Sequence, residues 1–380
     1  MINLGTFFES KAIYLCFSKL VGMKRLLLIT LLCGHMGLFA QDIHFSQFYM
    51  SPLNLNPALT GVMNCKMRVV ANYRNQWAPI LKSNSFNTYN LSFDQKIPVG
   101  RYDYFGFGGT FWGDKAGSLD FATIQFKLSG SYSKRMAGSR TSSHYLVFGG
   151  EAGLNQRSVN FQNAIWGTQI TSAGPNQTTI SGEPLDIDQG FLFADISVGL
   201  LWFSVLDKKN NYYIGGAFSH LNEPLQNHYR KGNGFVASPL YSKLTVHAGG
   251  DFAIDRKNSI LPGIVSFFQG PHWQLNAGTS FRFNMSKSKY DEQAFQLGLW
   301  ARLANKESFV EQTTDKKGGV LMDALILSTR FDYHKYGIGL SYDINTSRLR
   351  KASGANNAFE LSFIYNICSP EHRGIYCPNF

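Results

Sequence analysis

The chain has 380 residues, of which 44% are hydrophobic and 14% aromatic, and it carries a formal net charge of +11. Beyond position 40 no stretch approaches the roughly 20 consecutive apolar residues of a transmembrane helix, which excludes a helical membrane protein. The basic residues form no stripe with interleaved aromatic residues, so nucleic acid is not an expected partner.

The N-terminus carries the features of a targeting segment. Met23-Lys24-Arg25 is a short basic region, residues 26–32 are an apolar core, and Leu38-Phe39-Ala40 resembles a signal-peptidase site. These features predict that residues 1–40 are a signal peptide, removed on export. Met23 is the better start, and residues 1–22 are either the result of a misassigned start codon or a long n-region.

Residues 41–65 do not have the pattern of a strand. Pro52 and Pro57 interrupt the segment, and a proline cannot donate a hydrogen bond to a β-ladder. We expect a loop or short turns that lie in a lumen or at a periplasmic rim, where the segment would form a plug.

Residues 66–367 alternate between apolar and polar side chains with period two. In the last stretch, Phe359 and Leu361 fall on one face, whereas Glu360 and Ser362 fall on the other. A strand of this kind has one face in an apolar medium and one in a polar medium. About fourteen stretches qualify as strands: 66–77, 85–96, 103–113, 119–132, 144–157, 193–206, 211–221, 240–255, 258–268, 272–284, 292–302, 320–332, 335–344 and 357–367.

The connections between these strands differ in length in a regular way. Tight connections at 207–210, 255–258 and 333–335 fall on one side, and long connections at about 158–192, 222–239, 303–319 and 345–356 fall on the other. Outer-membrane barrels have short periplasmic turns and longer outer loops. A soluble β-sandwich also has one apolar face per strand, but it has no reason to keep this distribution. The sequence therefore predicts an all-β fold, a transmembrane antiparallel β-barrel of about 14 strands in the outer membrane.

The inferred lumen faces are polar. On 272–284, Gln274, Asn276 and Arg282 would face inward, while Leu275 and Phe281 would face lipid. A charged side chain on the lipid face costs up to a few kcal/mol, so the register of each strand is well specified. We expect opposed charges in the lumen to pair across strands.

Three cysteines remain after the predicted cleavage site. Cys368 and Cys377 bracket a short tail, residues 368–380, and could form a disulfide in an oxidising periplasm. The alternative is two free thiols. Cys65 is left without an assignment.

The sequence contains no motif that carries enzyme chemistry: no HExxH, CxxC, Walker A or GxSxG. Gly106 and Gly108 sit inside a predicted strand and indicate relief of crowding in the lumen. Asp186 and Asp188 lie in a long loop. They could bind calcium, but a solvated loop without bound metal is the simpler interpretation. A hydrolase would need a serine beside a lumen histidine such as His247, and it ranks last among the functions considered. We expect no enzyme activity, no cofactor and no metal.

At three places the sequence is similar to the PorP/SprF family. Residues 41–49 (QDIHFSQFY) and 52–61 (PLNLNPALTG) resemble the mature N-terminus of that family, and 73–77 (YRNQW) its first-strand motif. Ser341-Tyr342-Asp343 and the terminal 377–380 (CPNF) resemble its C-terminal signatures. Asn379 departs from that pattern, in which Arg is expected.

The resemblance implies an outer-membrane β-barrel of the type IX secretion system, with components of that system and a secreted surface protein as partners. It implies a role in secretion and surface retention of large cell-surface proteins, including gliding adhesins. The alternative from the residues alone is a passive channel for small solutes. Residues expected to hold the plug or contact a partner are His44, Phe45, Ser46, Gln47, Phe48, Asn56, Pro57, Tyr73, Arg74, Asn75, Gln76, Trp77, Ser341, Tyr342 and Asp343. The working hypothesis is a plug held by Arg74 and Asn75.

Overall fold

The computed structural model describes residues 42–139, 142–171, 174–176, 178–182, 190–207, 210–226, 238–286, 293–306, 319–347, 350–353 and 356–368. The predicted signal peptide, Asp186, Asp188 and Cys377 lie outside these residues, as do parts of the long connections, the stretch 287–292 and the tail from 369 onward.

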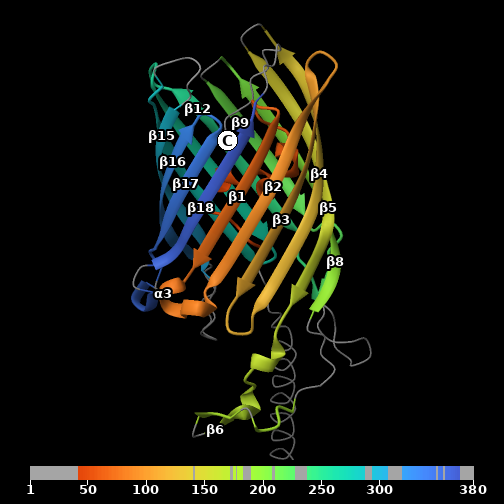
Figure 1. The fold of residues 1–380 in the computed structure, drawn as a ribbon, viewed down its shortest axis with the longest axis vertical. Helices are drawn as coiled ribbons and strands as arrows, with labels where there is room; N and C mark the ends of the chain where they lie inside the picture. The colour runs from red at the N-terminus through yellow and green to blue at the C-terminus, as the bar shows by residue number, and fades with distance from the viewer. Residues whose placement is uncertain are drawn as a thin grey trace, which may run out of the picture. The chain divides into compact units, whose positions relative to one another are not determined.

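A closed antiparallel barrel forms from fourteen strands of the described chain (Figure 1). This confirms the predicted fold class and strand number, and each predicted range overlaps one strand of the wall. The strands are β1 (Met67–Gln76), β2 (Phe86–Val99), β3 (Asp103–Ala116), β4 (Phe121–Gly138), β5 (Ser143–Ser158), β8 (Gly190–Val205), β9 (Asn211–Ser219), β12 (Lys243–Ala253), β13 (Asn258–Gln269), β14 (His272–Asn284), β15 (Gln293–Lys306), β16 (Gly319–Tyr333), β17 (Tyr336–Asn345) and β18 (Asn356–Ile367).

The remaining elements of the described chain are short. Two small hairpins pair β6 (Ile170–Thr171) with β7 (Gly174–Pro175) and β10 (Leu225–Gln226) with β11 (Ser238–Pro239). No helix among the described residues is long and apolar enough to cross a bilayer. The helical turns are η1 (Phe48–Met50), α2 (Pro52–Leu55), η2 (Pro57–Leu59), α3 (Ala78–Leu81), η3 (Lys82–Asn84), η4 (Phe161–Asn163), η5 (Gly167–Gln169) and α4 (Arg350–Ser353).

The barrel closes where its first strand meets its last. β1 pairs with β18 over ten residues, from Met67 opposite Ile367 to Gln76 opposite Ala358. Side chains alternate along the wall as expected: on β18, Phe359 is 43% exposed on the outer face, whereas Glu360 is fully buried inside. The wall therefore presents a continuous apolar surface outward.

The two mouths of the barrel differ. At the mouth that we call the turn end, β2 joins β3 through three residues and β16 joins β17 through two. At the opposite mouth, the loop end, α3, α4 and both small hairpins lie, together with the long connections (Figure 1).

The described N-terminal segment, residues 42–66, crosses the lumen from one mouth to the other, and we call it the plug. It starts at Asp42 near the loop end, where its backbone N–H donates to Gln269 Oε1 (3.0 Å) at the end of β13. It ends at the turn end, where Lys66 leads into β1. Its secondary structure consists of η1, α2 and η2, with Pro52 and Pro57 at helical N-terminal positions, where a missing N–H costs nothing.

The expected disulfide between Cys368 and Cys377 is wrong, because the structure joins Cys368 to Cys65, with Cα atoms 4.3 Å apart. Cys65 lies two residues before the start of β1 and Cys368 directly follows β18, so closure of the barrel brings the two cysteines to the same point of the turn end. Sequence spacing favoured the local pair because it contains no information on which strands meet.

Candidate functional site

Ser46 lies at the centre of a buried polar cluster that fixes the plug to the wall. Its hydroxyl contacts Asp343 Oδ2 (2.8 Å), accepts from Arg74 Nη1 (2.8 Å), and is also contacted by Arg302. The backbone N–H groups of Ser46 and Gln47 donate to the two oxygens of Glu360 (2.6 and 3.0 Å). The Ser46 cluster is defined as Ser46, Arg74, Arg302, Asp343 and Glu360.

The charges within the Ser46 cluster compensate one another. Arg302 forms an ion pair with Asp343 (2.8 Å), and Arg74 forms one with Glu360 and a longer one with Asp343 (3.4 Å). All four side chains are at most 4% exposed. Buried charges of this kind are tolerated only when they are paired and hydrogen-bonded, which fixes the position of the segment that supplies the shared hydroxyl.

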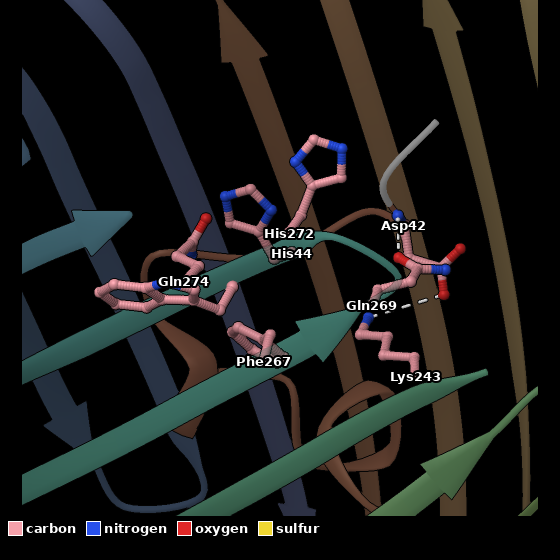
Figure 2. A pocket seen from close by; sticks show the side chains of 8 residues that line it. Asp42, His44, Lys243, Phe267, Gln269, His272 and Gln274 are labelled. Atoms are coloured by element: carbon pink, nitrogen blue, oxygen red, sulfur yellow. Dashed lines mark hydrogen bonds and ion pairs between the residues drawn. The ribbon is translucent and has the colours of Figure 1, made fainter. Parts of the chain in front are cut away.

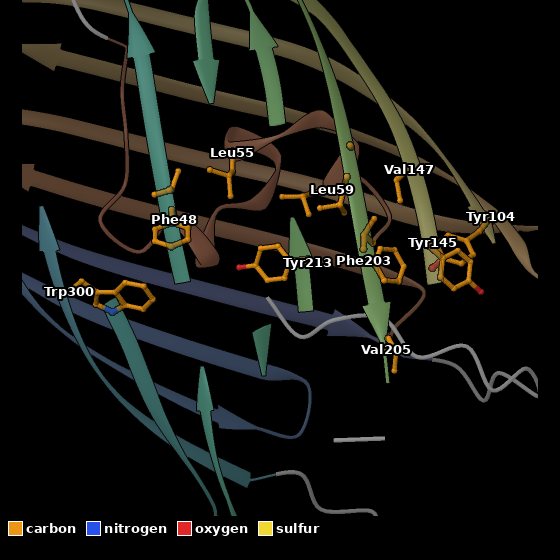
Figure 3. Close-up of a cluster of buried hydrophobic side chains, with 14 of the residues drawn as sticks. Phe48, Leu55, Leu59, Tyr104, Tyr145, Val147, Phe203, Val205, Tyr213 and Trp300 are labelled. Atoms are coloured by element: carbon orange, nitrogen blue, oxygen red, sulfur yellow. The ribbon is translucent and has the colours of Figure 1, made fainter. Parts of the chain in front are cut away.

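The middle of the plug packs through apolar side chains, so the lumen face carries a group of apolar residues in addition to the predicted polar ones (Figure 3). Phe48 meets Trp300 of β15 edge to face, with ring centroids 5.4 Å apart. Leu55 and Leu59 belong to the same cluster as Phe203 of β8. The sequence does not single out these wall residues, because they are isolated apolar positions on otherwise polar strand faces. They face inward because the apolar side chains of the plug cover them. The wall residues of this cluster are Tyr104, Tyr145, Val147, Leu201, Phe203, Val205, Tyr213, Val265, Trp300, Ala324 and Ile326.

Glycines on the lumen face let the plug approach the wall. A Cβ at Gly106 would lie 2.1 Å from the carbonyl oxygen of Thr60, and one at Gly149 would lie 2.4 Å from the backbone nitrogen of Ala58. Such distances are sterically forbidden, so larger residues here would displace the plug. The glycines of β3 thus relieve crowding against a segment of the same chain.

Further polar contacts hold the second half of the plug. Arg68 pairs with Asp94 (2.8 Å), and Asp94 Oδ2 accepts the backbone N–H of Gly61 (2.8 Å). Asn56 Nδ2 donates to the carbonyls of Leu200 and Gly216 (both 3.1 Å). Asn56 also lies 3.0 Å from His247 Nε2. His247 is therefore engaged with the plug.

At the loop end the plug is held by ion pairs. His220, which follows β9, lies between Asp42 Oδ2 (2.7 Å from Nε2) and Asp195 Oδ1 of β8 (2.8 Å from Nδ1). Lys243 of β12 lies 3.6 Å from Asp42, and Lys127 lies 2.7 Å from Asp195. We call Asp42, His220, Asp195, Lys127 and Lys243 the Asp42 cluster.

The carboxylates on both sides keep His220 protonated. Burial alone would lower the pKa of His220, but Asp42 and Asp195 outweigh it and raise that pKa to about 9. The pKa of Asp42 is well below its usual range, because His220 and Lys243 more than offset the effect of burial. The pKa of His44 is lowered by burial and by the cations Arg302, Arg74 and Lys243.

A hollow opens at the loop end next to the Asp42 cluster (Figure 2). Asp42 and His44 of the plug form one side of it, and β12, β13 and β14 form the other. Its wall residues are Lys243, Phe267, Gln269, His272, Trp273 and Gln274.

The predicted site residues divide between the two faces of the wall. Phe45, Ser46, Gln47, Phe48, Asn56 and Pro57 are buried in the lumen, as are Arg74, Ser341 and Asp343. The period of two that points Arg74 inward places its neighbours Tyr73 and Asn75 outward.

The outward residues do not hold the plug. Asn75 donates to Ser85 Oγ (3.0 Å) and Asn87 Oδ1 (2.7 Å), so the hypothesis that Asn75 holds the plug is not supported by its contacts. Tyr73 donates to the same Asn87 oxygen (2.9 Å), and Tyr342 is 40% exposed on the lipid-facing side.

Gln76 and Trp77 lie at the loop-end rim, where β1 ends. Trp77 has a positive φ of 59° at the start of α3, and its ring lies 5.1 Å from that of Phe86. Gln76 is the last residue of β1 and Trp77 begins the turn to β2, so neither belongs to the plug.

Sequence reasoning missed residues that complete the site: Arg302, Glu360, Arg68, Asp94 and His220. Four of them stand on the polar faces of strands, so each was visible as a lumen charge. Which charges meet depends on strand neighbours and on the path of the plug, and a single sequence shows neither.

The chain is similar to several solved structures at low sequence identity. They include CdiB from Escherichia coli (8% identity, TM-score 0.42, 78% of this chain and 63% of that chain). The CymD monoaromatic hydrocarbon channel is 11% identical with a TM-score of 0.43, over 88% of this chain and 96% of that chain. The toluene transporter TbuX of Ralstonia pickettii is 10% identical with a TM-score of 0.40, over 83% of this chain and 93% of that chain. At these values the similarities carry no argument about function. The chain spans less than two thirds of the length of CdiB.

No curated protein matched the chain. The model of one protein family, described as "Type IX secretion system membrane protein PorP/SprF", matches residues 38–365, which include the plug and nearly the whole wall. The resemblance carried by the motifs is confirmed, and the outer membrane is the location of this barrel. The chain belongs to the PorP/SprF family of type IX secretion system membrane proteins.

Proposed function

We propose that this barrel is a non-enzymatic component of the type IX secretion system that supports secretion and surface anchoring of a large, gliding-adhesin-like cell-surface protein. Family membership supports the link to secretion. The observation that carries the anchoring role is the plug, whose buried residues occupy the lumen from the Asp42 cluster to the disulfide. A barrel filled by its own chain is suited to be a fixed platform.

The partner would dock at the loop end. We expect the connections 158–192 and 222–239, only partly described, to provide most of the contact. Apolar side chains are exposed there, among them Ile170 (64%), Ile180 (88%) and Leu225 (64%). Exposed apolar side chains outside the membrane are typical of a binding surface.

A passive channel is the alternative. It requires a continuous path through the lumen, and the plug would have to leave for such a path to exist. That movement would expose the paired charges of the Ser46 cluster and the apolar cluster around Phe48. The energetic cost disfavours spontaneous opening.

Copurification and conductance test the proposal together. Barrel isolated from native membranes should bring down a large surface protein, and the purified barrel should be silent in planar bilayers. Deleting the gene should release that surface protein into the medium. Steady pores from the purified barrel, with retention of surface proteins unchanged in the deletion strain, would favour the channel.

A further inference from the structure

The hollow at the loop end combines a cation with aromatic walls. The Lys243 ammonium lies 5.1 Å from the centroid of the Phe267 ring. Both side chains line the hollow (Figure 2). The ring of His44 lies 6.3 Å from that of Phe267. The site therefore offers one positive charge and flat apolar surfaces within a few ångströms.

Lys243 retains capacity for a second anion. Its ammonium lies 3.6 Å from Asp42 Oδ2, which is longer than the roughly 2.8 Å of a charge-assisted hydrogen bond. The shorter contact of Asp42 Oδ2, at 2.7 Å, is with His220. An ammonium has three donors, so Lys243 can bind another carboxylate from the open side of the hollow.

The plug itself shows what kind of anion fits. Asp42 is a peptide carboxylate, and its backbone N–H is bound by the side chain of Gln269 (3.0 Å) in the same hollow. The wall thus already recognises an acidic residue through both its side chain and its backbone. An acidic residue of a peptide therefore fits this part of the lumen with its backbone and its carboxylate both bound.

We infer that this hollow binds an acidic side chain of an extended peptide segment, with Lys243 as the ion partner and Phe267 as the apolar wall. Resting on the proposed function, the inference makes that segment part of the secreted protein. The ligand would dock beside Asp42, so that recognition takes place where the plug meets the surface.

Peptide binding to the full-length barrel in nanodiscs tests the inference. The probes are a five-residue peptide with two glutamates and one phenylalanine, capped at both ends, and its counterpart with glutamines. Removing one charge-assisted hydrogen bond from a partly buried site lowers affinity by about tenfold or more. We expect Lys243→Gln to show that decrease for the acidic peptide, and the glutamine peptide to bind the unmodified barrel as weakly.

Lys257→Gln is the matched control, since it removes the same charge from an exposed turn at the opposite end of the barrel. Its affinity for the acidic peptide should equal that of the unmodified barrel. If Lys243→Gln does not fold, Phe267→Ala serves instead and must also weaken binding.

Three results would overturn the inference: equal affinity for both peptides, equal affinity of the Lys243 and Lys257 variants, or preference for an acidic oligosaccharide such as oligogalacturonate. Copurification of a surface protein with the Lys243→Gln barrel, at unchanged yield and affinity, would reject this site while leaving the anchoring role intact.

Discussion

The two ends of the plug are held by different kinds of interaction. At the loop end Asp42 is bound by ion pairs to His220 and Lys243, whereas at the turn end Cys65 is covalently bonded to Cys368. Between them lie the paired charges around Ser46 and the apolar packing around Leu59. Ion pairs respond to pH, salt and competing charges, and a disulfide does not. One end can therefore respond to its surroundings while the other stays fixed.

The largest expected effect comes from the covalent end. Replacing both Cys65 and Cys368 with serine releases a cross-link between residues 303 positions apart. The chain-entropy relation gives a loss of about 6 kcal/mol in the free energy of unfolding. Urea unfolding in detergent measures this loss, and a reductant should reproduce it in the unmodified chain.

Cys377→Ser is the control for that variant and should leave the unfolding midpoint unchanged. Mass spectrometry of a non-reducing digest identifies the disulfide directly. A peptide pair joined through Cys368 and Cys377 would contradict the Cys65–Cys368 bond.

Asp343→Asn should have the next largest effect. The variant leaves the positive charges of Arg302 and Arg74 buried in the lumen without the negative charge of Asp343. Breaking a buried ion pair lowers the free energy of unfolding by about 4 kcal/mol. Asp323→Asn removes another partner of Arg302, 3.5 Å away but 31% exposed, and should cost at most about 1 kcal/mol. Equal unfolding free energies for the two variants would argue against a buried Ser46 cluster.

Leu59→Ala tests the apolar middle of the plug. Leu59 is fully buried, so its truncation leaves a cavity and should lower the free energy of unfolding by about 3 kcal/mol. Leu327→Ala removes the same atoms from the outer face, where lipid or detergent fills the space, and should cost less. A larger loss at Leu327 would mean that the plug does not pack as described.

The smallest effect is the response of the loop end to pH. Because the pKa of His220 is raised to about 9, its charge stabilises the folded barrel fully below about pH 6.5, and this contribution is lost as pH rises through 9. Between about pH 7.5 and 9.5 we expect a loss of about 2 kcal/mol, measured by urea unfolding. His220→Gln should remove that pH dependence. An unchanged dependence in the variant would assign it to other groups.

The wall was predictable from the sequence because the alternation of side chains along a strand depends only on neighbouring residues. A period of two tells which side chains face lipid, and Phe359 and Glu360 fall as that rule requires. The same rule places Asn75 outward once Arg74 is inward, although the motif groups them together.

The lumen was not predictable, because its contacts join residues far apart in the chain. Ser46 and Glu360 are 314 positions apart, and Cys65 and Cys368 are 303 apart. Val147 and Phe203 look misplaced on a water-facing surface until the plug covers them. Without relatives to compare, a sequence gives no sign of which distant residues meet.

The path of the plug sets the order of events during biogenesis. The segment precedes the first strand in sequence, yet it lies inside the cylinder that the later strands complete. A finished cylinder has no opening in its side through which a bulky, partly helical segment could be inserted. The segment is therefore either in place before β1 joins β18 or enters through a mouth of the closed barrel. In both cases Cys65 and Cys368 meet only when these two strands pair, so oxidation of the two cysteines follows closure of the wall.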